Sequence, residues 1–417
     1  MTIQIADKPV GPDLLDPKLH GHPEMIRQRA DEAPPVFWSE KWRAWCVTGY
    51  PEAFAILKDS RFSLEYNMRK TEQTQDLSPE ALELRRELYC GGLTHLNFDQ
   101  GRSLLVMDPP EHTPYRRILQ PFFLDREVAK FLPIIHGIVD RLINAWGTSD
   151  EIEFMNGLAY PLPVILFGDI LGIPQELRHK FIDYDAFTNT RNTKSTLANV
   201  EDYRKAAAQG PAYSAKIDEV ISAKRACPMH DIFSTLVTAQ IDGKPIPDAR
   251  VRAMVYLLNT GSVTTTTTLI GNCIYYFRHF GIWDRIRDNL DLLPQAIEES
   301  LRFDPPAPYV GREMAVDMEL GGQMLKKGET VLIFFNAANR DVREFSDPSE
   351  FQIERSPNRH LSFGFGGSHF CLGAPFARQE ALISVTEMMK RYPNLEVIGE
   401  PEHANAFGFS KLMLKLH

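Results

Sequence analysis

The sequence has few cysteines, and they are too widely spaced for a disulfide framework or a structural zinc site. The five are Cys46, Cys90, Cys227, Cys273 and Cys371, and no two of them form a Cys-X-X-Cys pair. An odd number leaves at least one thiol without a partner in the chain. Structural zinc sites usually draw their ligands from closely spaced cysteine pairs. The sequence therefore predicts neither a disulfide-stapled domain nor a structural zinc site.

The chain also lacks a targeting signal, an apolar run of membrane-spanning length and an excess of basic residues. Its N-terminus, Met-Thr-Ile-Gln-Ile-Ala-Asp-Lys-Pro, has no basic region followed by an apolar run. No later stretch is both long and apolar enough to cross a bilayer. The net charge of −9 argues against a general nucleic-acid binder. We expect a soluble cytoplasmic protein that binds neither nucleic acid nor membrane.

What the chain does supply is enough apolar material for a sizeable core, since 43% of its 417 residues are hydrophobic. Helical patterns dominate residues 108–302, whereas strand patterns occur near both ends. The expected helices are 23–32, 51–57, 79–89, 127–146 (interrupted at Pro133), 161–171, 174–187, 212–225 and 247–277. The expected strands are 36–39, 44–50, 319–324, 329–335, 395–398 and 411–416. No linker divides the chain, so we expect one mainly helical domain over residues 1–417, with a small β-rich region built from both ends.

The most informative stretch is Ser362-Phe-Gly-Phe-Gly-Gly-Ser-His-Phe-Cys371-Leu-Gly-Ala-Pro, which an amphipathic helical pattern follows. Glycine lets backbone approach a flat ligand closely. A cysteine that enters a helix lies near the positive end of the helix dipole, which favours thiolate over thiol. A glycine-rich loop that holds a thiolate is how a protein offers sulfur to haem iron. The alternative is a buried structural cysteine before an ordinary helix, and other motifs must decide.

The segment from Asp108 to Arg116 predicts a helix on which His112 and Arg116 share one face. Two hydrogen-bond donors there could hold anionic groups such as haem propionates. The helix could begin at Asp108-Pro109, or at Thr113-Pro114 with His112 just outside it. As an isolated pattern, the segment is more often a solvated helix face.

Glu299 and Arg302 are three residues apart on an expected helix and can form an ion pair. On a surface such a pair is worth only about 0.5 kcal/mol, but a buried pair joined to a distant arginine would fix local geometry. Arg312 and His360 are further candidates for propionate contacts. For each, the alternative is a surface side chain.

The long helix expected over 247–277 contains five consecutive threonines, Thr264 to Thr268, shortly after Gly261. Threonine and glycine are both poor helix formers. Either the helix is distorted there, so that hydroxyls and freed carbonyls hold water, or the hydroxyls bond back to the helix's own carbonyls. The residues alone leave both arrangements open.

In this order and spacing, the motifs from His112-X-X-X-Arg116 to Cys371 resemble those of soluble bacterial cytochromes P450. The resemblance implies a mainly helical triangular-prism fold, with haem b buried between the long helix and the cysteine loop. It implies that Cys371 is the axial thiolate ligand of the haem iron. The other implied haem contacts, to the propionates, are His112, Arg116, Arg312 and His360. Glu299 and Arg302 would be the structural pair, engaging the segment that contains Arg355 or Arg359.

The resemblance also implies a monooxygenase that oxidises a hydrophobic or aromatic small molecule with dioxygen. Two electrons would come from a separate ferredoxin and its reductase, and the enzyme would be a monomer. The implied pocket residues are mainly apolar, which suits such a substrate. They are Leu96, Phe98, Leu104, Asn259, Thr260, Val263, Tyr309, Val310 and Phe407.

Two departures from the family pattern affect the chemistry. The cysteine loop carries one extra residue among Gly366, Gly367 and Ser368, which should change the backbone N–H groups that face the sulfur. The long helix lacks the family's acid before the threonine that helps to deliver protons. The two possible alignments put Val263 and Thr264, or Thr264 and Thr265, at the acid and alcohol positions.

Thr264 and Thr265 are therefore the candidate catalytic residues, with water or a remote group as the source of protons. The alternatives are a haem–thiolate reaction of another kind (oxidative coupling, dehydration or peroxide-driven oxidation) and a haem-based sensor or binding protein.

Overall fold

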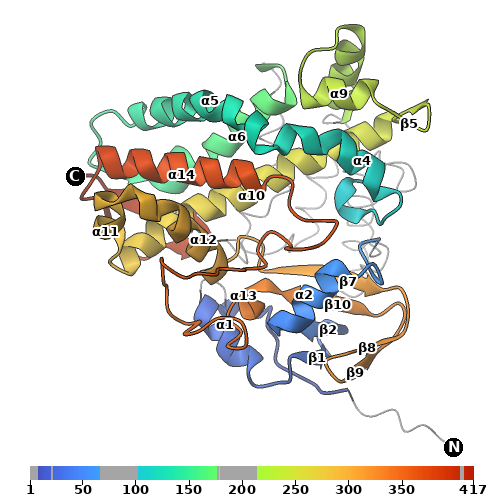
Figure 1. The fold of residues 1–417 in the computed structure, drawn as a ribbon. Helices are drawn as coiled ribbons and strands as arrows, with labels where there is room; N and C mark the ends of the chain where they lie inside the picture. The colour runs from blue at the N-terminus through green and yellow to red at the C-terminus, as the bar shows by residue number, and fades with distance from the viewer. Residues whose placement is uncertain (1–7, 20–21, 66–101, 176–177, 179–213, 404–407) are drawn as a thin grey trace, which may run out of the picture.

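The computed structural model describes residues 8–19, 22–65, 102–175, 178, 214–403 and 408–417. A helical part and a sheet-rich part lie against each other in the view of Figure 1, with α5, α6, α10 and α14 in one and the five-stranded sheet in the other. The helices of four or more residues, apart from 214–226, are α1 (Pro23–Ala30), α2 (Tyr50–Lys58), α4 (His112–Leu119), η5 (Gln120–Phe123), α5 (Asp125–Asn144), η6 (Met155–Ala159), α6 (Pro161–Leu171), α9 (Ile232–Thr238), α10 (Asp248–His279), α11 (Trp283–Asp288), α12 (Leu293–Phe303), α13 (Phe335–Ala338) and α14 (Ala374–Arg391). Single turns form η1 (Pro17–Leu19), η4 (Leu104–Val106) and η7 (Leu290–Leu292).

The strands of the largest sheet come from both ends of the chain, as the sequence predicts. Their order is β1-β2-β10-β7-β3, and only the β2–β10 pair is parallel. These strands are β1 (Val36–Ser39), β2 (Ala44–Val47), β3 (Phe62–Ser63), β7 (Tyr309–Met314) and β10 (Thr330–Phe334). The remaining strands are β4 (Glu151–Glu153), β5 (Gln240–Ile241), β6 (Lys244–Pro245), β8 (Met318–Leu320), β9 (Gln323–Leu325), β11 (Glu396–Val397), β12 (Glu402–His403), β13 (Phe409–Lys411) and β14 (Met413–Lys415).

The predicted strand over 319–324 is a hairpin, β8–β9, whose turn is Gly321-Gly322. Both glycines have positive φ, 56° and 77°, which a tight two-residue hairpin turn requires and which glycine adopts without steric cost. The predicted helices 161–171 and 247–277 are found as α6 and α10. The expected helices 79–89 and 174–187 lie wholly or mostly outside the described residues.

The prediction that Pro133 interrupts its helix is wrong, because α5 runs unbroken through it. Proline removes one backbone hydrogen bond and strains one turn. The buried face of α5, with Ile135, Ile138 and Val139, packs against α6 and α14 and outweighs that local cost.

α10 is a continuous helix of 32 residues in spite of its threonine run. Most of the hydroxyls bond to carbonyls one turn earlier on the same helix: Thr265 Oγ1 to Gly261 O at 2.8 Å and Thr267 Oγ1 to Val263 O at 2.7 Å are examples. Of the two arrangements left open above, the structure has the back-bonded one. Among the described residues, no helix is long and apolar enough to cross a membrane.

α14 carries a buried acid, Glu380. Within the described part of the chain, neither carboxyl oxygen has a hydrogen-bond partner. Burial raises the pKa of Glu380 well above its usual value of 4.5. The folded chain thus keeps a proton that the unfolded chain releases, so folding stability falls as pH rises above about 4.5.

We expect Glu380→Gln to remove this pH-dependent loss. Between pH 4.5 and the pKa of Glu380 in the folded protein, the wild type's free energy of unfolding should fall relative to that of the variant. The difference should grow by up to about 1.4 kcal/mol per pH unit. Urea unfolding at pH 5, 6.5 and 8 measures the difference. Glu396→Gln, at an exposed position on β11, is the control and should show no such trend. A Glu380→Gln difference that stays constant with pH would contradict the assignment.

Candidate active site

Cys371 lies three residues before the first residue of α14, so its sulfur faces the N-terminal end of that helix. Backbone N–H groups of Gly373 and Ala374 donate to the sulfur. Burial raises the pKa of the Cys371 thiol above its usual value, and these two N–H groups and the charges of Arg116 and Arg378 offset part of that rise. The side chain nevertheless has accessible surface, so the sulfur is not enclosed in the apolar core. These are the conditions under which a thiolate can bind a metal ion.

The loop that carries Cys371 is held by its own backbone and by α2. Cys371 N donates to Phe363 O at 2.9 Å, which closes the loop across the glycines. A Cβ on Gly367 would lie 2.0 Å from Leu57 O of α2, so only glycine allows this contact. Phe365 stacks on Phe54 of α2 with ring centroids 5.8 Å apart. The region of the extra residue therefore lies directly against α2.

Two histidines and two arginines from three segments gather beside this loop. His112, the first residue of α4, lies with its ring 4.1 Å from that of His369. Both Nε2 atoms are buried and have no hydrogen-bond partner among the described residues. Arg116 donates to Phe370 O at 2.6 Å, and the largely buried Arg312 projects from β7.

All four groups have lowered pKa values, because burial penalises positive charge, and nearby positive charge lowers the pKa of the two histidines further. The pKa of His112 falls to about 4 through burial and the charge of Arg116. The pKa of His369 falls to about 3 through burial and the charges around it, and burial lowers that of Arg312 to about 10. An anionic group among these four side chains would stabilise their positive charge. It could also accept hydrogen bonds from the two imidazole rings. The cluster therefore fits carboxylates such as the two propionates of haem, next to a sulfur placed for the iron.

The structure does not bring His360 into this cluster. Its Nε2 lies 3.1 Å from a carboxylate oxygen of Glu298, and its Nδ1 accepts from Ser362 N at 3.3 Å. Both ring nitrogens are thus engaged, and the histidine that belongs to the cluster with His112 is His369. The position of His369 in the sequence could have indicated this, because it lies two residues before Cys371 on the same loop. His360 precedes the loop.

Glu299 is the centre of a fully buried polar node. Glu299 and Arg302 are both 0% exposed and form a two-bond ion pair at 2.7 and 2.8 Å. Arg355 Nε lies 3.2 Å from the same carboxylate, and Gln352 N and Asn358 Nδ2 also donate to it. Of the two arginines considered from the sequence, Arg355 makes this contact. The node ties α12 to the irregular segment that leads to the cysteine loop.

Thr264 differs from its neighbours on α10. Its Oγ1 is buried and has no hydrogen-bond partner in the described part of the chain, whereas the Thr265 hydroxyl is bonded to Gly261 O. Val263, before it, is buried and apolar. The two candidate threonines are therefore not equivalent, and Thr264 has the available hydroxyl.

The predicted pocket residues are only partly covered by the structure. Leu104, Asn259 and Val263 are buried, and Thr260, Tyr309 and Val310 are half-buried. Leu96, Phe98 and Phe407 lie outside the described residues.

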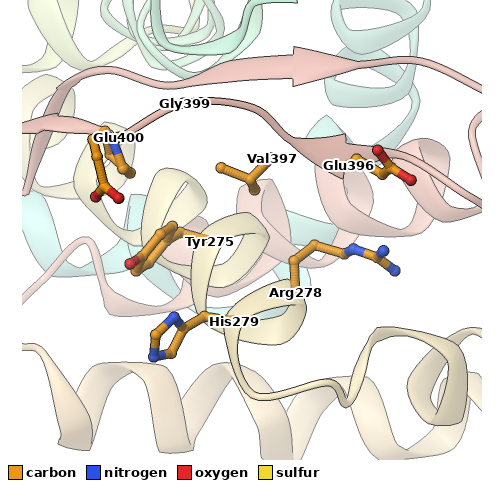
Figure 2. Close-up of a pocket in the computed structure, with 8 residues that line it drawn as sticks. Tyr275, Arg278, His279, Glu396, Val397, Gly399 and Glu400 are labelled. Atoms are coloured by element: carbon orange, nitrogen blue, oxygen red, sulfur yellow. The ribbon is translucent and has the colours of Figure 1, made fainter.

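A separate cleft of about 410 Å³ lies at the C-terminal end of α10 (Figure 2). Tyr275, Arg278 and His279 form one wall, and β11 and the following turn form the other. At 1.5 Å per residue, this wall is about 17–22 Å along the helix from Thr264. The cleft is therefore distinct from the site at Cys371.

Comparison with known proteins places this geometry in a family. The family model for cytochrome P450 matches residues 281–413. The chain is 35% identical over 338 residues to putative cytochrome P450 YjiB of Bacillus subtilis, covering 79% of this chain and 84% of the relative. It is 32% identical to nocardicin C N-oxygenase of Nocardia uniformis, covering 86% and 84%.

Solved structures agree with the sequence relatives. CYP109E1 of Bacillus megaterium in complex with testosterone matches with a TM-score of 0.81 and 29% identity, over 96% of this chain and 99% of that one. P450BioI in complex with an acyl carrier protein matches with a TM-score of 0.83 and 26% identity, over 96% and 100%. The predicted mainly helical P450 fold is thereby confirmed. The chain belongs to the cytochrome P450 family and is a haem–thiolate monooxygenase.

Proposed function

We propose that the protein oxidises a hydrophobic or aromatic small molecule in the cytoplasm, as a monomer with a single catalytic domain over residues 1–417. Two electrons would come from a separate ferredoxin and its reductase. The observation that carries the proposal is the pairing of an accessible thiol at a helix N-terminus with a buried basic cluster. Haem b would supply the dioxygen chemistry when bound.

The chain's own residues have distinct tasks in this proposal. Cys371 binds the iron, and the cluster of His112, Arg116, Arg312 and His369 binds the propionates, in place of the predicted His360. The donors of the cluster are buried before any ligand binds, so they orient the carboxylates with little reorganisation. The Glu299 node keeps the segment before the cysteine loop in one conformation.

Thr264 is proposed to position the water that delivers protons. Its hydroxyl is available for such a water, whereas that of Thr265 is committed to Gly261 O. Val263 has no ionisable group, so the proton must reach Thr264 from solvent through water.

We expect Thr264→Ala to lower the product formed per NAD(P)H consumed, on the order of tenfold or more, because a positioned proton donor is lost. Thr265→Ala is the matched control and should stay close to wild type, since its hydroxyl only bonds back to the helix. Product and NAD(P)H are quantified in the same reaction. Unchanged coupling in both variants would remove the threonines from proton delivery and favour a reaction of another kind.

The substrate class is supported by the apolar character of the proposed pocket and by the relatives. CYP109E1 was solved with testosterone and with corticosterone, and P450BioI with hexadec-9Z-enoic acid on its carrier protein. The test is an optical titration of purified ferric protein with testosterone, free hexadec-9Z-enoic acid and small aromatic compounds, followed at the Soret band. We expect at least one of these to shift the band and to be turned over. No shift of the Soret band with any of these compounds would contradict the proposed class.

A further inference from the structure

Arg378 of α14 is held in one orientation by Glu298 of α12. Arg378 Nε donates to Glu298 Oε1 at 2.6 Å, and Arg378 Nη2 donates to Glu298 Oε2 at 2.8 Å. Two parallel bonds of this kind fix both the position and the plane of a guanidinium group. The pair bridges two helices that pack on each other beside the cysteine loop (Figure 1). Arg378 therefore has little freedom to move as an ordinary surface arginine does.

The fixed guanidinium lies on the cysteine loop. It sits over the ring of Phe363, 4.6 Å from the ring centroid. The carbonyl of Phe363 accepts the backbone N–H of Cys371 at 2.9 Å. His360, which also contacts Glu298, has its ring 5.9 Å from Phe363. Arg378 and His360 thus both lie against the residue that closes the loop on Cys371.

The charge of Arg378 acts close to Cys371, because the ring that the guanidinium covers belongs to Phe363, whose carbonyl accepts the backbone N–H of Cys371. Arg116 also lies beside Cys371, since it donates to Phe370 O, but it has no carboxylate partner among the described residues, whereas Arg378 is paired with Glu298. Hydrogen bonds from Arg378 and His360 hold the pKa of Glu298 down at about 2 against the effect of burial. Glu298 is therefore an ionised counter-charge at any physiological pH.

We infer that Glu298 and Arg378 are positioning residues that set the electrostatic potential at Cys371, and so the ease with which the bound haem iron accepts an electron. The inference rests on the proposed role of Cys371 as the iron ligand. A positive charge near the ligand favours the reduced, more negative state, and a negative charge disfavours it. The negative charge of Glu298 thus offsets part of the potential that Arg378 produces at Cys371. Its two hydrogen bonds also hold the guanidinium at a fixed distance from the cysteine.

The test uses haem-loaded wild type, Arg378→Gln, Glu298→Gln and the double variant, with the midpoint potential measured by spectroelectrochemistry. Arg378→Gln should lower the potential and Glu298→Gln should raise it, and the double variant should lie between them. Each single change should alter the ratio of reduced to oxidised haem at a fixed electrode potential about tenfold, the effect of one unit charge over about 10 Å at a protein's effective dielectric. Arg391→Gln, on the same helix but paired with Asp140, should leave the potential unchanged.

Changes of opposite sign in the midpoint potentials of Arg378→Gln and Glu298→Gln distinguish an electrostatic role from a purely structural one. Loss of structure would move both single variants in the same direction and the double variant furthest. Shifts of equal sign, or no shift, would overturn the inference. A weaker affinity for ferredoxin at an unchanged potential would place the pair on a partner-binding surface and overturn it too. Failure of the proposed function would be visible separately, because the wild type itself would then lack the spectrum of a thiolate-bound haem.

Discussion

Cys371→Ser is expected to abolish monooxygenase activity and the thiolate character of the bound haem. A serine hydroxyl keeps its proton near neutral pH, whereas the backbone N–H groups of Gly373 and Ala374 help the sulfur to lose its own. Removing a group outside the ligand shell of a metal site typically costs 10–100-fold, so loss of the ligand itself should exceed about 100-fold. Turnover, haem content and the Soret band of the reduced CO complex measure the effect.

The matched control for this change is Cys227→Ser, which alters an exposed thiol. It should match wild type in turnover and spectrum. Because Cys371 has accessible surface and the basic cluster is untouched, Cys371→Ser should fold and could still retain some haem through the propionates. Wild-type activity or an unaltered CO spectrum in Cys371→Ser would rule out this cysteine as the ligand.

Glu299→Ala should destabilise the fold by about 3–5 kcal/mol, because it leaves buried arginine charge without its partner. Arg302 is 0% exposed and Arg355 nearly so, and both lose the same carboxylate. A loss of this size is a large part of the total stability of about 5–15 kcal/mol of a typical domain. We therefore expect poor yield, low haem content and a lower urea midpoint.

Glu219→Ala provides the comparison, since Glu219 is exposed and pairs with Lys216 in solvent. It should cost less than about 1 kcal/mol. Glu299→Gln keeps the shape of the side chain and should fall between the two. A Glu299→Ala protein as stable as Glu219→Ala would mean that the node does not stabilise the fold.

The features that the sequence predicted well depend on local spacing. α6 and α10 follow from long periodic patterns, and Glu299 and Arg302 pair because i and i+3 share a helix face. The place of Cys371 before α14 follows from glycines and small residues next to it in the chain. In each case the contacts that decide the outcome lie within a few residues.

The features that were missed depend on distant partners. His369 and not His360 joins the basic cluster, because α4 brings His112 against it from far away in the sequence. α5 continues through Pro133 because α6 and α14 pack on it. The free hydroxyl at Thr264 could not be read from five identical threonines, since their environments differ only in the folded chain.

The parallel pairing of β2 with β10, with Ala44 opposite Thr330, has a consequence for how the protein is made. At roughly 5–20 residues per second, the ribosome needs about 14–57 s to reach Thr330 after Ala44 has been added. During that time β2 can pair only with β1, and the hydrogen-bonding groups of its other edge have no strand partner. The sheet is therefore completed only after β10 has been synthesised, so its assembly depends on a pairing between segments that are far apart in the sequence.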